Sequence, residues 1–528
     1  MSNTIQGLAL IGGQPVRGNG KPFQAFDPSK NEAIGPDFNA VDAAQVAEAC
    51  ALAGAAFDSF RATSDHERAD FLDLIAAQIL ALGDDLIVRA MAETGLPRAR
   101  LEGERGRTMN QLKLFAELLR EGSWQDARID TALPTRTPPR PDLRLRFVGV
   151  GPVAVFGASN FPLAFSVAGG DTAAALAAGC PVVVKAHSAH PGTSELVGRA
   201  VVEALRQSGL PAGVFALLTG SGHGIGDTLV RHPAIQAVGF TGSRSGGTAL
   251  MATAASRPQP IPVYAEMSSI NPVVLLPGAL AARGADIATG FAGSLTMGVG
   301  QFCTNPGLVL GIAGPDFDRF AAAAAEALKP VAAATMLTPG IASAYQRGED
   351  QLAAQAEVAT LLRGTSASCQ GAPSLFKTTG AAFLTNHAMS SEIFGPASLL
   401  VACKDLDELL AVIEGLEGQL TATLQLQDDD ESDISAARTL LPALERKVGR
   451  ILANGYPTGV EVSTAMVHGG PFPATSDGRS SSVGTAAIQR FLRPVCYQNL
   501  PRALLPAVLR EPNERGLWRR RDGALTRN

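Results

Sequence analysis

Charge is scarce in this sequence of 528 residues: Asp, Glu, Lys and Arg together make up 18%, against roughly a quarter in typical globular chains. The 44 Lys and Arg nearly balance the 49 Asp and Glu, and no large basic block occurs. Proteins that bind nucleic acid or anionic lipid usually carry such a block, so we expect neither partner and favour a small molecule. Apolar residues make up 46%, which excludes global disorder.

Cysteines are few, and their spacing does not suggest a disulfide framework. The six are scattered, no CxxC pair occurs, and no signal peptide precedes them. We therefore expect a reducing, cytoplasmic location. Long hydrophobic runs are also missing, because the most apolar stretch, residues 163–184, contains Asp171, Pro181 and three glycines. Such a stretch is a poor bilayer span, so we expect no membrane segment.

Repeats and low-complexity tracts do not stand out, and charge runs are short. The basic run near the C-terminus is Arg519–Arg521. It is shorter than the blocks that are typical of interaction tails, so we interpret it as part of a solvated terminus.

The sequence does contain clear helix and strand patterns. Ser64 and Glu67 have the spacing of a capping box, and apolar residues at helical spacing follow them and recur as far as Leu119. In residues 143–147, Leu and Phe alternate with Arg. This period of two predicts a strand with one apolar and one solvated face, available as an edge for assembly.

From Val153 the pattern changes to short apolar runs separated by helix-length segments. The runs are residues 153–156, 182–184, 215–218 and 237–240. Repeated β-α-β units predict a parallel sheet with helices on both faces. A second alternating set extends from about residue 273 to residue 453. The predicted fold class is therefore α/β, with two α/β domains.

Three residues are candidates for chemistry, and each has an ordinary structural alternative. Cys303 lies among small, turn-forming residues, so its thiol is either an exposed nucleophile or a buried, inert group. Glu266 lies between apolar residues and is either a general base or a surface glutamate at a strand end. Asn160 follows a predicted strand and either directs its amide at a developing oxyanion or forms an ordinary turn.

A glycine-rich segment, residues 239–246, follows a predicted strand and opens a helix. Free N–H groups at such a helix start can meet a phosphate. The spacing is not G-x-G-x-x-G, and glycine-rich turns are common in α/β proteins. The segment alone therefore predicts no particular ligand.

Taken in order, these segments resemble the aldehyde dehydrogenase superfamily. Its order is an Asn turn, a cofactor Lys, a Gly turn, a base Glu, a nucleophile Cys and a Glu-x-Phe-Gly-Pro motif. The matching residues here are Asn160, Lys185, Gly242, Ser243, Glu266, Cys303, Glu392 and Phe394. The resemblance covers residues from about 26 to 500, and six ordered matches outweigh the structural alternatives for single residues.

Within the superfamily, the resemblance is strongest to the 2-oxoglutarate semialdehyde (2,5-dioxopentanoate) dehydrogenases and their NADP-using relatives. Three stretches carry it, residues 185–195, 300–307 and 468–475. One departure follows Glu266, where Met267-Ser268-Ser269 stands in place of the commoner Leu-Gly-Gly. The expected role of Glu266 as a base survives this change.

The resemblance implies NAD(P)-dependent oxidation of an aldehyde to a carboxylic acid, with no metal. Cys303 would form a thiohemiacetal with the aldehyde, and the Asn160 amide and the Cys303 backbone N–H would stabilise the oxyanion. Glu266 would deprotonate the water that hydrolyses the thioester. The substrate implied is 2-oxoglutarate semialdehyde and the product 2-oxoglutarate.

The resemblance also implies which residues bind the cofactor. NADP or NAD would be held by Lys185, Ser188, Gly242, Ser243, Glu392 and Phe394. Ser188 stands where NAD-preferring relatives often carry a glutamate, so NADP should be accepted, with His223 as a second contact.

For the substrate, we expect contacts from Phe161 and Arg107. By resemblance Arg107 lies at the substrate entrance, where a guanidinium can hold a carboxylate with two hydrogen bonds. A solvated arginine in a local basic run is the alternative for this residue.

The resemblance divides the chain into a Rossmann-like cofactor domain (1–130 and 151–263), a catalytic domain (264–465) and a small β oligomerisation element (131–150 and 480–500). It implies a homo-oligomer, either a dimer or a tetramer. Three alternatives stay open: an NADP-dependent dehydrogenase of other aliphatic aldehydes, an acylating enzyme that uses coenzyme A, and a catalytically silent binding protein.

Overall fold

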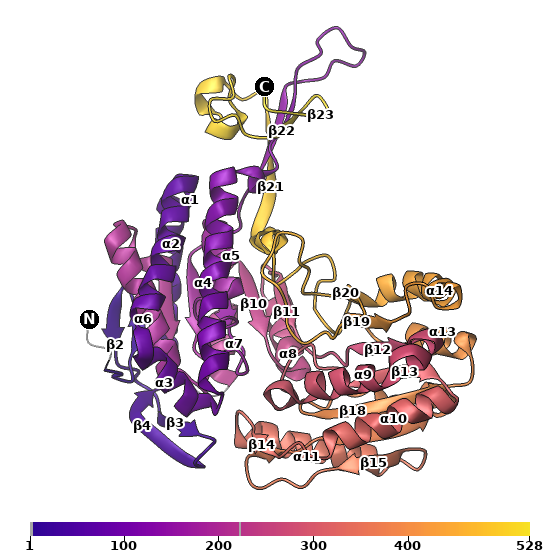
Figure 1. Ribbon diagram of the computed structural model, residues 1–528. Helices are drawn as coiled ribbons and strands as arrows, with labels where there is room; N and C mark the ends of the chain where they lie inside the picture. Colours follow the sequence, from indigo (N-terminus) through magenta and orange to yellow (C-terminus); the bar gives the residue numbers. More distant parts are fainter. Residues whose placement is uncertain (1–3, 221–222) are drawn as a thin grey trace.

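Two seven-stranded sheets form the centres of two lobes, and a five-stranded sheet forms an arm that projects from them (Figure 1). This architecture is seen in a computed structural model that describes residues 4–220 and 223–528. The mixed α/β fold predicted from the sequence is confirmed. The two lobes lie side by side, and the candidate chemical residues come from both.

The first sheet consists mainly of short parallel strands. Its order is β11 (Val263–Glu266), β10 (Ala237–Thr241), β7 (Val153–Phe156), β8 (Val182–Lys185), β9 (Phe215–Leu218), β1 (Ala9–Ile11) and β2 (Gln14–Val16). Strands β7 to β11 pair in parallel, and β1 and β2 add an antiparallel edge. Strand order reverses between β7 and β10, which is where open α/β sheets usually bind ligands.

Helices cover both faces of this sheet, so its strands are buried on both sides. Helices α2 (Asp65–Ala81), α4 (Arg98–Glu121), α5 (Gly170–Ala177) and α6 (Pro191–Ser208) pack on the face that contains Val153 and Val155. Helices α1 (Ala43–Arg61), α7 (His223–Arg231) and α8 (Arg244–Ala255) pack on the other face, with Ala154 and Phe156. Burial on both faces explains why the strands read as continuous apolar runs.

The second sheet is built in the same way. Its order is β15 (Ala359–Arg363), β17 (Ser374–Thr379), β18 (Ala397–Cys403), β13 (Leu308–Ile312), β12 (Pro272–Leu275), β19 (Gln419–Gln425) and β20 (Val448–Ala453). One face packs on α9 (Pro277–Thr296) and α10 (Pro315–Leu328), and the other on α13 (Leu406–Gly415) and α14 (Glu431–Lys447). Only five residues separate β11 of the first sheet from β12 of the second.

The arm corrects two interpretations of the sequence: the strand that contains residues 143–147 lies inside its sheet and is not an edge, and the C-terminal basic run is not solvated. Its sheet has the order β21 (Leu492–Gln498), β6 (Leu143–Gly149), β5 (Arg128–Asp130), β22 (Arg519–Arg521) and β23 (Ala524–Thr526). The basic run at Arg519–Arg521 is thus a strand and not a solvated terminus. Arg519 is 1% exposed, and its guanidinium contacts the Glu511 carboxylate at 2.7 Å. Burial is tolerated because the charge is paired and hydrogen-bonded.

Several local predictions are confirmed. Ser64 and Glu67 form a reciprocal capping box at the start of α2. The strands predicted at 153–156 and 215–218 occur at those residues. Within residues 4–220 and 223–528, no helix combines the length and apolar character needed to cross a membrane.

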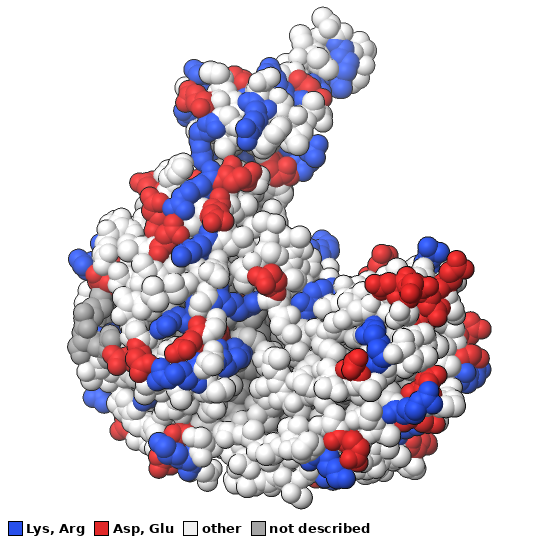
Figure 2. Space-filling view, viewed as in Figure 1, with Lys and Arg blue, Asp and Glu red and all other residues white. Residues whose placement is uncertain are grey.

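Surface charge is mixed, as the near-balance of acidic and basic residues suggests. On the face shown in Figure 2, basic and acidic side chains are interspersed over the body and the arm. Acidic side chains gather at the edge of the second lobe, over the region where Figure 1 places α14.

Candidate active site

The candidate residues meet where the two lobes face each other. Glu266 is the last residue of β11, and Lys185 is the last residue of β8. Asn160 follows β7, and Gly242 and Ser243 follow β10. All of them therefore lie at the carboxyl edge of the first sheet, around the point where strand order reverses.

The loop that carries Cys303 comes from the second lobe and is held on several sides. It follows α9 and the 3-10 turn Met297–Gly300. Gly300 has φ +64°, and a Cβ there would lie 2.3 Å from the backbone of Gly395, so only glycine fits. Asn271 Nδ2 donates to the carbonyl oxygens of Cys303 and Asn305, each at 2.9 Å. These bonds fix the loop on which the thiol depends.

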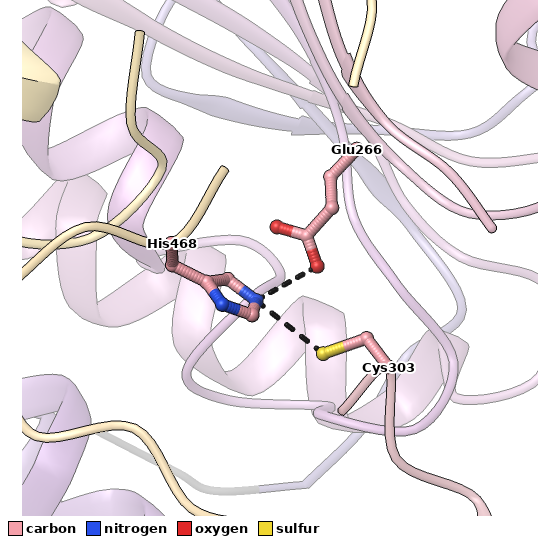
Figure 3. A group of neighbouring side chains, drawn as sticks. All are labelled: Glu266, Cys303 and His468. Carbon is pink, nitrogen blue, oxygen red and sulfur yellow. Dashed lines mark hydrogen bonds and ion pairs between the residues drawn. The ribbon is translucent and has the colours of Figure 1, made fainter. Parts of the chain in front are cut away.

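The thiol of Cys303 lies against Glu266 and His468 (Figure 3). His468 Nε2 is 2.9 Å from Glu266 Oε1 and 3.4 Å from Cys303 Sγ. The nearest ligand-type atoms of the three residues all lie within 4.8 Å of one another. Sulfur, carboxylate and imidazole thus form one contact group, in which Glu266 is buried and Cys303 is half-buried. Glu266 is therefore not a surface glutamate, and the roles of Cys303 as nucleophile and Glu266 as base stay predictions.

The hydrogen bonds define how the imidazole is oriented. His468 Nδ1 is buried and has no partner in the described part of the chain. A proton there would be left unsatisfied, so the arrangement favours the proton on Nε2, where it is donated to Glu266. Ser482 Oγ donates to the second carboxylate oxygen of Glu266 at 2.8 Å. Both oxygens of the carboxylate are therefore held in place.

Electrostatics keep Glu266 ionised beside a protonated thiol. Burial by itself would raise the pKa of Glu266. The electrostatic attraction of His468 outweighs it, together with hydrogen bonds from His468, Ser482 and Cys303, so the pKa is lowered. Burial, followed by the Glu266 charge, raises the pKa of Cys303 well above that of a free thiol. In this state the proton therefore stays on sulfur, and the ionised carboxylate beside it is the nearest acceptor when the thiol reacts.

Asn160 lies beside the same loop. Its Nδ2 donates to the carbonyl oxygen of Gln301 at 3.0 Å. An amide has two N–H groups, so one remains for an oxyanion that forms near Cys303. The structure brings Asn160 to the nucleophile loop, and its role as an oxyanion donor stays a prediction.

A hollow of about 670 Å³ leads to Cys303. Phe161, Phe165 and Phe302 give it an aromatic wall, with ring centroids 5.1 and 5.4 Å from Phe161. Arg107 of α4 also lines it. Both predicted substrate residues, Arg107 and Phe161, thus share one hollow with the thiol, and their contact with substrate stays a prediction.

Residues around the first sheet fit a dinucleotide. Ser243 caps α8 through a hydrogen bond from Gly246 N at 3.2 Å, and a Cβ at Gly242 would lie 2.7 Å from the Phe240 ring. The turn thus leaves little room for a side chain at Gly242 and presents a helix N-terminus, which suits a pyrophosphate. Burial lowers the pKa of Lys185 to about 8, and its ammonium makes no hydrogen bond or ion pair with any described residue. A ribose hydroxyl would satisfy it.

The second lobe supplies the remaining predicted cofactor residues. Burial raises the pKa of Glu392 to about 8, and the Ser269 backbone donates to it. Phe394 lies two residues further on, next to Gly395, whose carbonyl accepts from Asn305 Nδ2 at 3.0 Å. Ser188 is half-buried in the turn between β8 and α6. The expectation at His223 concerns a side chain outside the described residues.

Three residues of this site escaped the analysis of single motifs. His468 stands in one of the stretches that carried the family resemblance, and that was the available signal. Ser482 and Asn271 reach Glu266 and the Cys303 loop only through the fold. Ordinary turn sequences surround both, so nothing local distinguishes them.

Fold and site together define a two-sheet α/β protein in which a half-buried cysteine lies against a buried carboxylate between the two lobes. The family model described as "Aldehyde dehydrogenase family" matches residues 16–493. The chain belongs to the aldehyde dehydrogenase family.

Similar proteins extend this result. Alpha-ketoglutaric semialdehyde dehydrogenase 2 of Azospirillum brasilense is 62% identical, over 98% of this chain and 99% of its own. Alpha-ketoglutaric semialdehyde dehydrogenase of Acinetobacter baylyi is 51% identical, over 99% of each chain. The crystal structure of an NADP-dependent glyceraldehyde-3-phosphate dehydrogenase from Bacillus halodurans, complexed with NADP, has a TM-score of 0.79 at 20% identity, covering 94% of this chain and 99% of that one. This last likeness concerns the fold.

Proposed function

We propose that the protein oxidises 2-oxoglutarate semialdehyde to 2-oxoglutarate, with NADP or NAD as the electron acceptor. The observation that carries the proposal is the 62% identity to a dehydrogenase named for this substrate, over nearly the full length of both chains. The contact group of Cys303, Glu266 and His468 supports it, because an aldehyde oxidation of this kind needs a nucleophile beside a base.

In the first step Cys303 attacks the aldehyde carbon. Glu266 takes the thiol proton, the sulfur–carbon bond forms, and the carbonyl oxygen becomes an oxyanion. The free N–H of the Asn160 amide and the Cys303 backbone N–H stabilise that oxygen. His468 and Ser482 act as positioning residues, because they hold the two oxygens of Glu266.

The cofactor, when bound, accepts the hydride that turns a thiohemiacetal into a thioester. We assign its pyrophosphate to the turn at Gly242 and Ser243, and its riboses to Lys185, Ser188 and Glu392. Phe394 would support the nicotinamide ring. Once Glu266 has released the thiol proton to solvent, its carboxylate deprotonates the water that adds to the thioester. The carbon–sulfur bond then breaks, the Cys303 thiolate takes up a proton, and the acid is released.

The remaining parts of the proposal concern assembly and location. The arm places an exposed strand edge at β23, with Leu525 58% exposed. We assign it to contacts within a homo-oligomer, a dimer or a tetramer, because exposed edges are usually paired or covered. The cysteine usage favours a cytoplasmic location.

The test is a product assay on the purified protein. It is incubated with 2-oxoglutarate semialdehyde and either NADP or NAD, with and without coenzyme A, and the product is identified by NMR. We expect 2-oxoglutarate without any need for coenzyme A. An acyl-CoA product, or a higher kcat/KM for pentanal than for the semialdehyde, would overturn the assignment.

A further inference from the structure

Two arginines from different lobes line the hollow that leads to Cys303. Arg107 comes from α4 of the first lobe, and Arg450 comes from β20, the edge strand of the second sheet. The sequence patterns did not single out Arg450. Its position against the same hollow follows only from the way the two lobes meet.

Carbonyl groups of one short loop hold both guanidinium groups. Arg107 Nη1 donates to the carbonyl oxygen of Val460. Arg450 Nη1 donates to Gly459 O at 3.0 Å, and its Nη2 donates to Pro457 O at 2.7 Å. These bonds fix where the two charges lie, but neutral carbonyls do not balance them.

Each guanidinium also keeps a donor without a partner. Arg107 Nη2 and Arg450 Nε are buried and make no hydrogen bond in the described part of the chain. Burial lowers the pKa of both groups, yet an arginine in a protein stays charged. Two half-buried positive charges without a carboxylate partner favour the binding of an anion in the hollow.

A third arginine in the hollow, Arg100, also keeps a buried Nε without a partner in the described part of the chain, but its charge is paired. Arg100 Nη1 forms an ion pair with Glu104 at 2.8 Å, and its guanidinium lies 4.3 Å from the centre of the Phe161 ring. Arg107 and Arg450 form no ion pair with any carboxylate among residues 4–220 and 223–528. Two acidic residues line the hollow: Glu104 is paired with Arg100, and Glu461 is exposed to solvent.

We propose that Arg107 and Arg450 together bind the carboxylate at the far end of the substrate, through the guanidinium groups that line the hollow. This inference rests on the proposed function, and it extends that function to a substrate class: aldehydes with a carboxylate or 2-oxo acid group at the other end. The aromatic wall around Phe161 contacts the methylene groups between. A neutral aldehyde would leave both charges unpaired, so the pair selects acidic substrates.

The test compares Arg450→Met, Arg107→Met and the double variant with the protein as it is. Arg105→Met is the matched control, since Arg105 also lies on α4 but donates to Gly83 O at 2.9 Å, away from the hollow. We measure kcat/KM for 2-oxoglutarate semialdehyde and for pentanal. Each single variant should lower the ratio of kcat/KM for the semialdehyde to kcat/KM for pentanal about 10- to 100-fold, mainly by raising KM for the semialdehyde. The control variant should leave this ratio unchanged.

A second measurement needs neither the cofactor nor turnover. The compound 2-oxopentanoate, which matches the substrate without its aldehyde oxygen, should slow alkylation of Cys303 by iodoacetamide. The concentration that gives half protection should rise at least tenfold in Arg450→Met and Arg107→Met but not in Arg105→Met. Arg450→Lys should retain part of the protection, because it keeps the charge but loses the guanidinium geometry.

The two proposals fail in different ways. If the unmodified protein does not oxidise the semialdehyde, the proposed function is wrong, and the protection assay still decides whether the arginines bind a carboxylate. If it does oxidise the semialdehyde and Arg450→Met leaves both the substrate ratio and the protection unchanged, the assignment of Arg450 is wrong.

Discussion

Glu266 and His468 are 202 residues apart in the chain, and their Oε1 and Nε2 atoms lie 2.9 Å from each other. Glu266 ends a strand of the first sheet, whereas His468 lies in the long connection after β20. The base of the proposed reaction is thus held by a residue that belongs to neither sheet.

Replacing His468 by Ala should therefore change the pH dependence of the reaction. The contact lowers the pKa of Glu266, so its loss raises that pKa, and a carboxylate with a raised pKa is protonated at higher pH. The acid limb of the kcat–pH profile should move to higher pH. At the low-pH end of that limb, kcat should fall at least about tenfold. Ser482→Ala should shift the limb in the same direction. An unmoved limb in both variants would show that these contacts do not tune the base.

Replacing Cys303 by Ala should abolish oxidation and leave cofactor binding nearly unchanged, because the thiol is the nucleophile and not a cofactor contact. The measurement is turnover together with the Kd for NADP. Cys496→Ala is the control, since Cys496 is an exposed free cysteine on β21. Substantial turnover by the Cys303 variant would remove the nucleophile from the mechanism.

Replacing Glu266 by Gln should separate oxidation from hydrolysis. Hydride loss precedes thioester hydrolysis, so the variant should still give a burst of reduced cofactor, followed by a slow steady state. The burst should also be slower than in the unmodified protein, since Gln cannot accept the Cys303 proton. Rapid-mixing absorbance at 340 nm measures both phases. A variant with no burst at all would contradict this division of roles.

Ser188 should decide how well NADP is accepted. A carboxylate at this position would repel a 2′-phosphate, so Ser188→Glu should lower kcat/KM for NADP about a hundredfold or more, equal to roughly 2.7 kcal/mol. The value for NAD should change much less. If the unmodified protein uses NADP a hundredfold less well than NAD, Ser188 does not control the choice.

Arg519→Ala should destabilise the arm. The guanidinium is buried and contacts Glu511 and the carbonyl of Arg510, so its loss leaves polar groups unpaired, at a cost of about 2 to 4 kcal/mol. Arg520→Ala is the control, because the side chain of Arg520, the next residue in the strand, is exposed. Urea unfolding compares the two. Equal stability of the variants would mean that the buried pair contributes little.

The sequence predicted those features whose causes are local. A capping box needs only Ser64 and Glu67 three residues apart, and a strand buried on both faces needs only a short apolar run such as Val153–Phe156. Glu266, Cys303 and Asn160 were found because family resemblance supplies an order of motifs. Their mutual contacts were not visible in that order.

The features that were missed depend on contacts between distant segments. Ser482 reaches Glu266 across 216 residues, and Arg450 meets Arg107 only at the junction of the lobes. Arg519 was misjudged because a short basic run normally lies in solvent, whereas here the strand pairing of β22 carries it inward. Charge and spacing do not reveal such pairing.

The short link between β11 and β12 makes the chemistry sensitive to small rotations of one lobe against the other. Glu266 moves with the first sheet and Cys303 with the second, and residues 267–271 join them. Gln419 of β19 clamps this hinge by accepting from Ile270 N at 2.6 Å and from Ser269 Oγ at 2.9 Å. A rotation that separated sulfur and carboxylate by a few ångströms would stop proton transfer while each lobe stayed folded. In this enzyme, inactivation should therefore precede unfolding.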